Sequence, residues 1–87
     1  MIFISLRKMR KKPNKETSVQ TAKMMEEFKK KGINVLSWYW TLGRYDVVFI
    51  YEAEGEQDAL RMSFEANDFV TSETLVAIPN EEAIRLL

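Results

Sequence analysis

Side chains that could bind a ligand or transfer a proton concentrate in the middle of the chain. Three consecutive aromatic residues start at position 38, an Arg-Tyr-Asp triplet starts at position 44, and a further tyrosine and a glutamate follow. Tyrosine and carboxylate groups can donate or accept protons, and a guanidinium group can bind an anion. The candidate ligand-binding residues are therefore Trp38, Tyr39, Trp40, Arg44, Tyr45, Asp46, Tyr51 and Glu73.

The composition excludes several kinds of chemistry. The 87 residues include no cysteine and no histidine, which excludes a thiolate nucleophile, a histidine general base and the usual zinc-finger ligands. Only Tyr, Asp, Glu, Arg and Lys remain for acid–base work, and no nucleophile–base pair is visible, so no catalytic residue is assigned. No carboxylates are spaced for a metal ion, and we expect neither a metal nor a cofactor.

The charges are unevenly distributed although they sum to zero. Residues 1–32 hold ten basic and three acidic residues, whereas residues 33–87 hold three basic and ten acidic ones. This polarity is typical of solvated faces, of a nucleic-acid-binding segment or of charge matching between subunits. Within the basic part we expect a possible anion-binding loop formed by Arg7, Lys8, Arg10, Lys11 and Lys12.

Side-chain periodicity predicts the elements that position these residues. Alternating patterns favour strands at residues 1–7, 33–41, 46–51 and 70–78. Apolar residues at helical spacing favour a helix from a capping box at Thr17 to the residues before Gly32. A second helix is expected over 56–68, with Leu60 and Phe64 on its apolar side. Asn80 is expected to cap a short helix in the tail 80–87.

The order of these elements predicts one ferredoxin-like domain over residues 1–87. A βαββαβ chain folds into an α+β structure, a four-stranded antiparallel sheet with two helices on one face. In the second strand, alternation places Leu36, Trp38 and Trp40 on one side and Val35 and Tyr39 on the other. Both sides of the second and third strands are apolar, and two helices cover only one, so we expect a second copy to pack on the other.

The segment Ser-Trp-Tyr-Trp-Thr-Leu-Gly-Arg-Tyr-Asp over residues 37–46 resembles the central motif of the GYD-domain family. The similarity continues into Glu52-Ala53 and, more weakly, into Thr71-Ser72-Glu73-Thr74-Leu75. The resemblance implies a ferredoxin-like fold of the dimeric α/β-barrel group from a prokaryotic cytoplasm, with no firmly assigned activity. One difference is the Lys/Arg-rich loop after the first strand, where the family usually has a mixed polar loop.

Three classes of function remain open. The first is a homodimeric small-molecule-binding or regulatory module, with a small apolar or aromatic ligand in an aromatic-lined pocket between two sheets. The second is a cofactorless oxygenase or isomerase, which the fold group permits by analogy alone. The third is an RNA-recognition-type binder of single strands that uses the basic loop 7–12. Asp46 stands where that signature has Gly or Ala, which disfavours nucleic acid.

The expected location is the cytoplasm. A chain without cysteine gains no stability from an oxidising compartment. Its longest apolar run is too short for a membrane span, and its N-terminus lacks the layout of a signal peptide. The expected partners are therefore a second copy of the chain and a small ligand, with no membrane.

Overall fold

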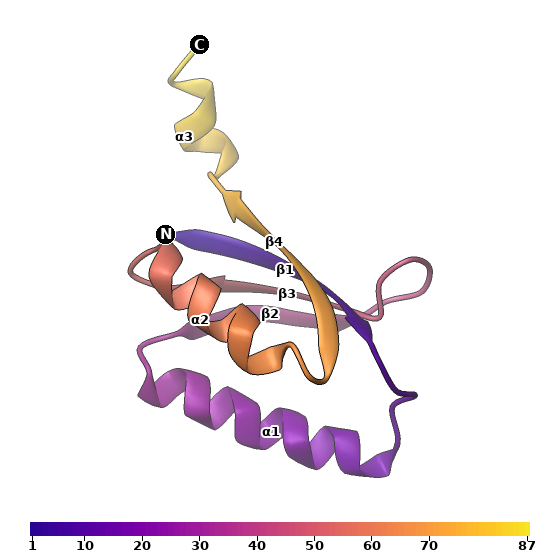
Figure 1. The fold of residues 1–87 in the computed structure, drawn as a ribbon. Helices are drawn as coiled ribbons and strands as arrows, with labels where there is room; N and C mark the ends of the chain where they lie inside the picture. Colours follow the sequence, from indigo (N-terminus) through magenta and orange to yellow (C-terminus); the bar gives the residue numbers. More distant parts are fainter.

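The computed structural model describes every residue from Met1 to Leu87 and contains four strands and three helices (Figure 1). In chain order they are β1 (Ile2–Met9), α1 (Lys15–Lys30), β2 (Asn34–Trp40), β3 (Val47–Glu52), α2 (Glu56–Ala66), β4 (Val70–Ala77) and α3 (Asn80–Ile84). None of the helices is both long and apolar enough to span a membrane.

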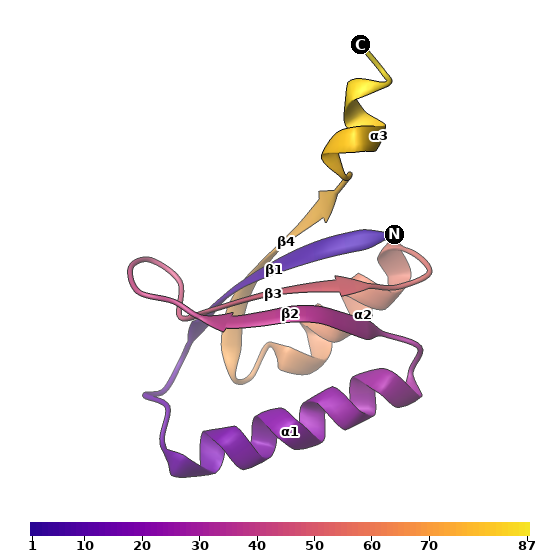
Figure 2. The ribbon, with the colours of Figure 1, turned by 180° about the vertical axis from the view of Figure 1, so that it is seen from behind.

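The strands form one antiparallel sheet in the order β2-β3-β1-β4. This order confirms the predicted α+β, ferredoxin-like arrangement, in which each βαβ unit places its second strand at an outer edge. Helices α1 and α2 lie on the same side of the sheet, while α3 continues away from the sheet beyond the end of β4 (Figures 1 and 2). The sheet therefore has one covered face and one face without helices.

Helix α1 begins three residues earlier than the sequence pattern indicates. Asn14 is the N-cap, and its side chain accepts a hydrogen bond of 2.9 Å from the Glu16 N–H. The Thr17 hydroxyl returns the interaction by accepting from the Asn14 N–H at 2.8 Å. The capping box is therefore formed by Asn14 and Thr17, and the expectation that Thr17 is the N-cap is wrong because Asn14 occupies that role. Gly32 follows the helix with a φ of +80°, as expected of the residue after a C-cap.

A β-bulge in β2 changes which side chains share a face. Val35 pairs with Tyr51 and Ser37 pairs with Ile50, so Leu36 is an extra residue that has no partner on β3. The bulge turns Val35 to the helix-covered face, the same face as Trp38, whereas strict alternation had placed these two on opposite faces. Leu36 itself stays 47% exposed.

The core lies between the covered face of the sheet and the two helices. Phe3, Phe49 and Tyr51 are almost completely buried there, against Phe28 of α1 and Met62 of α2. The rings of Phe3 and Tyr51 stack with centroids 5.3 Å apart. Only 12 of the 87 residues are buried, so this core is small for the length of the chain.

Two apolar residues of α2 and one capping residue of α3 differ from expectation. Leu60 is 54% exposed and Phe64 is 68% exposed, because only Ala59 and Met62 of this helix are turned fully into the core. In α3, Pro79 occupies the N-cap position, and Asn80, the predicted cap, is the first helical residue.

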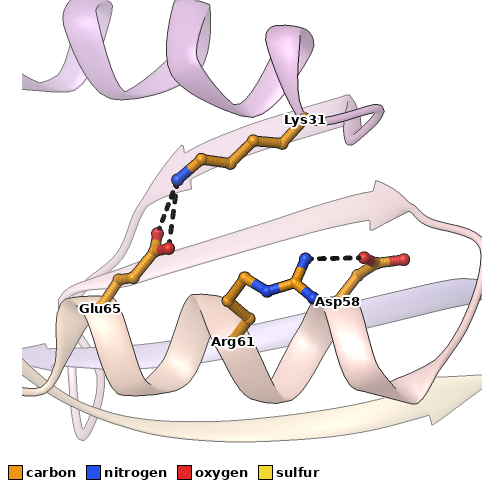
Figure 3. Close-up of polar contacts among 4 residues, drawn as sticks. All are labelled: Lys31, Asp58, Arg61 and Glu65. Atoms are coloured by element: carbon orange, nitrogen blue, oxygen red, sulfur yellow. Dashed lines mark hydrogen bonds and ion pairs between the residues drawn. The ribbon is translucent and has the colours of Figure 1, made fainter.

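Ion pairs on the helical side of the molecule are exposed. Lys31, at the end of α1, reaches Glu65 of α2 with an N–O distance of 3.0 Å, and Arg61 lies 3.4 Å from Asp58 one turn away (Figure 3). Exposed pairs of this kind contribute about 0–1 kcal/mol each. The Lys31–Glu65 pair connects the two helices, whose packing otherwise depends on the sheet beneath them.

Arg7 belongs to the core and not to a surface loop. Strand β1 continues through Met9, and Arg7 is only 4% exposed on the covered face. Its Nε donates to Ser5 Oγ at 3.0 Å, and its guanidinium lies 4.7 Å from the ring centroid of Phe49. Burial lowers the pKa of Arg7, because no carboxylate lies beside it to offset the loss of water. The assignment of Arg7 to an anion-binding loop is therefore wrong.

We predict that this buried charge is a cost to stability. Replacing both members of the hydrogen bond, in the variant Ser5→Ala/Arg7→Met, removes the cation and its partner while filling much of the volume. The free energy of unfolding should stay equal or rise by about 1–4 kcal/mol in urea denaturation at fixed protein concentration. Arg7→Ala, the control, should lose about 2 kcal/mol or more because it leaves a cavity. A double variant less stable than the wild type would contradict this account.

Candidate functional site

The face of the sheet without helices carries a continuous apolar surface. Its side chains follow from the strand register, since directly paired residues point to the same side. One row across the sheet pairs Ile50 with Ile4 and Ile4 with Leu75. The next row pairs Val48 with Leu6. These side chains are half-buried or exposed, because nothing in the chain covers them. We call this surface the open face.

The aromatic candidates divide between the two faces of the sheet. Tyr39 pairs with Val48 and lies on the open face, where it is 56% exposed. Trp38 and Trp40 pair with Phe49 and Val47, so both lie on the helix-covered side, and Tyr51 is buried in the core, where burial raises its pKa. The open face is therefore mainly aliphatic, and Tyr39 is the one aromatic candidate among its apolar rows.

Trp38 and Trp40 instead form one wall of a groove on the helical side. The groove has a volume of about 430 Å³ and lies between the end of β2 and the first turns of α1, which contribute Thr17, Ser18 and Thr21. Trp38 stacks on Phe49 with ring centroids 4.5 Å apart, and its indole N–H is buried without a hydrogen-bond partner. The packing of Trp38 thus serves the core, while Trp40 remains 50% exposed.

The connection between β2 and β3 holds Arg44 and Tyr45 at one end of the sheet. Gly43 has a φ of +98°, a conformation that favours glycine, and lets the chain reverse. The Thr41 hydroxyl donates to the Tyr45 carbonyl at 2.7 Å, and the Thr41 N–H donates to the Asp46 carbonyl at 2.9 Å. Arg44 then lies over the Tyr45 ring, 5.8 Å from its centroid.

Asp46 connects this turn to the end of β1. Its carboxylate Oδ2 accepts a hydrogen bond of 2.7 Å from the Met9 N–H, and its own N–H donates to the Arg7 carbonyl at 2.8 Å. Both contacts extend the pairing of β1 with β3 beyond the regular ladder. One oxygen of this carboxylate therefore holds the backbone at the end of β1.

Tyr45 and Glu73 form a hydrogen bond between distant segments. The phenol O–H donates to Glu73 Oε2 at 2.5 Å. This hydrogen bond, with smaller effects of burial and of the Glu73 charge, raises the pKa of Tyr45, while the nearby Arg44 charge opposes the shift. The sequence indicated both residues as candidates but gave no sign of the hydrogen bond between them. This bond depends on the register of β4 on β1, which places Glu73 beside Leu6.

Several of the candidates meet at one hollow on the open face. It has a volume of about 270 Å³ and is lined by Leu6, Lys8, Arg44, Tyr45, Thr71, Ser72 and Glu73. Leu6 and Thr71 are lining residues that the sequence did not indicate, because only strand pairing brings them beside the turn. We call this site the polar hollow.

The other residues of the predicted basic loop do not join the polar hollow. Arg10 is fixed elsewhere, since its Nε donates to the Asn67 carbonyl at 2.8 Å and its N–H donates to Phe69. Lys11 and Lys12 are exposed beyond the end of β1. Of the five basic residues proposed as an anion-binding loop, the structure therefore brings only Lys8 to the hollow. No group of three acidic residues that could hold a metal ion is present.

We predict that Asp46 stabilises the fold as a hydrogen-bond acceptor. Asp46→Ala should lower the free energy of unfolding by about 1.5–3 kcal/mol, because the Met9 N–H loses a charged partner. Asp46→Asn keeps an acceptor oxygen and should lose less than half as much in the same urea titration. Equal losses in the two variants would contradict a hydrogen-bonding role.

A second prediction concerns the Tyr45–Glu73 pair. Glu73→Gln should lower the pKa of Tyr45 toward its ordinary value of 10.0, which a spectrophotometric titration of the phenolate measures. In the wild type, the stability contributed by this bond should be present below pH 10.0 and be lost as the pH rises through the raised pKa. An unchanged tyrosine titration in Glu73→Gln would show that the bond does not persist in solution.

Comparisons with known proteins gave one match. No curated protein and no solved structure matched the chain. The family model of the GYD domain matches residues 5–87, which include the turn with Gly43, Tyr45 and Asp46 as well as the polar hollow. Since the match spans nearly the whole chain, the protein belongs to the GYD domain family.

Proposed function

We propose that the protein is a homodimeric small-molecule-binding module in which two copies pack their open faces together. The observation that carries this proposal is the apolar open face itself, which ends in the polar hollow. Two sheets packed face to face lie about 10 Å apart. Large side chains fill the space between them, whereas small side chains leave a cavity there. A ligand would occupy the space between the two sheets.

The exposed area of the single chain supports a partner. The chain exposes 6667 Å², whereas a monomeric protein of this mass exposes about 5,300 Å². Tyr39 and Leu75 on the open face are among the large apolar side chains left exposed. An interface of ordinary size covers about 800 Å² per subunit. A sheet-to-sheet interface would therefore cover much of the difference between the two exposed areas.

The distribution of side chains supports a binding module more than the alternatives. An RNA-recognition surface requires exposed aromatic residues on its first and third strands, but Phe3, Phe49 and Tyr51 are buried beneath the helices. Neither the Glu73 nor the Asp46 carboxylate is hydrogen-bonded to a serine or threonine hydroxyl, so the structure offers no nucleophile–base pair for catalysis. The polar groups of the site therefore favour holding a ligand in place.

We predict that a charge at the centre of the open face separates the subunits. Ile50→Lys should convert a wild-type dimer to a folded monomer in sedimentation velocity at micromolar concentration, because burying a lysine against a second sheet is costly. Leu60→Lys, the matched control, adds the same charge at an exposed apolar position of α2 and should leave the dimer intact. Circular dichroism checks that both variants fold.

Two results would contradict the proposed dimer. A monomeric wild-type protein would show that no dimer forms. If Leu60→Lys dissociated the dimer and Ile50→Lys had no effect, the interface would lie on the helices. The binding part has its own measurement, the fluorescence of an uncharged apolar dye. The dimer should bind the dye saturably, whereas a dimer that binds none has a filled interior and serves only for assembly.

A further inference from the structure

We infer that the polar hollow binds the head group of an amphipathic carboxylate whose apolar body lies on the open face. This inference deepens the proposed function, since the second sheet would enclose the apolar body. It is based on three features: the order of polar and apolar rows along the open face, two cations without ionic partners, and the net charge of the hollow.

The open face changes from apolar to charged along the strands. The row of Ile50, Ile4 and Leu75 is entirely aliphatic. The next row places Leu6 beside Glu73, and the row after it places Lys8 beside Thr71. A ligand that matches this order has a hydrocarbon portion at one end and a hydrogen-bonding, charged group at the other.

Lys8 and Arg44 are free to bind an anion. The ion pairs of the structure are Lys30–Glu27, Lys31–Glu65 and Arg61–Asp58, and none of them involves either residue of the hollow. The one carboxylate that lines the hollow, Glu73, is hydrogen-bonded by Tyr45. An incoming carboxylate would therefore meet an ammonium and a guanidinium group without displacing an existing ion pair, with the Thr71 hydroxyl as a further donor.

The charge of the hollow distinguishes between anions. Two cations and one carboxylate line it, so its net charge is that of one cation. A carboxylate with a single negative charge neutralises this surface, whereas a phosphate monoester with nearly two charges would be left with excess charge beside Glu73. The chemistry of the hollow thus favours a monoanionic carboxylate over a phosphate monoester.

Calorimetric titration of the full chain with octanoate, octyl phosphate and octanol tests this inference. The wild type should bind octanoate more tightly than either of the other two probes. Arg44→Gln and Lys8→Gln should each weaken octanoate binding about tenfold or more, since each removes a charged donor, and should leave octanol binding unchanged. Lys12→Gln removes the same charge from an exposed position outside the hollow and should leave octanoate binding unchanged.

The outcomes separate this inference from the proposed function. The carboxylate site would be overturned if the wild type bound octanoate no more tightly than octanol, or if Arg44→Gln bound octanoate as tightly as the wild type. In either case, a dimer seen in sedimentation velocity would still support the proposed function. Tighter binding of octyl phosphate would overturn the assignment to a monoanion. A monomeric wild type would instead overturn the proposed function, and the enclosed apolar body with it.

Discussion

The structure depends on one constraint: β3 is apolar on both sides, but the chain has helices for only one. Val47, Phe49 and Tyr51 pack beneath α1 and α2, while Val48 and Ile50 point to the open face. Because successive side chains of a strand alternate between faces, no rearrangement of this strand buries both sets within one copy. The uncovered apolar rows of the open face follow from this shortage of helices.

Gly43, Tyr45 and Asp46 contribute mainly to the geometry of the turn between β2 and β3. Gly43 permits the reversal, Asp46 secures the turn to the backbone of β1, and Tyr45 reaches across to Glu73 on the edge strand. Together they close one end of the open face with polar groups. The hydrogen bonds of Tyr45 and Asp46 thus hold the turn against two strands, while Arg44 lies over the Tyr45 ring and has no ionic partner.

The sequence predicted the order of elements and the antiparallel sheet because side-chain alternation and helix capping are local properties. It could not predict the bulge at Leu36, since no glycine or proline marks it, and this single extra residue changed the face of Val35. Arg7 was misplaced for a related reason: a run of basic residues resembles a loop, while the strand continues beneath it. The Tyr45–Glu73 contact was unpredictable because it joins segments 28 residues apart.

The fold also disperses the run of basic residues over positions 7–12. The basic residues that follow one another in the sequence are separated in space: Arg7 enters the core, Lys8 reaches the open face, and Arg10 binds the carbonyl of Asn67. Alternation along β1 is responsible, since neighbouring residues of a strand point to opposite sides. These three basic residues, which the sequence suggested would form one charged surface, therefore lie in three separate environments. Of the three, only Lys8 on the open face lies where a ligand between two sheets could contact it.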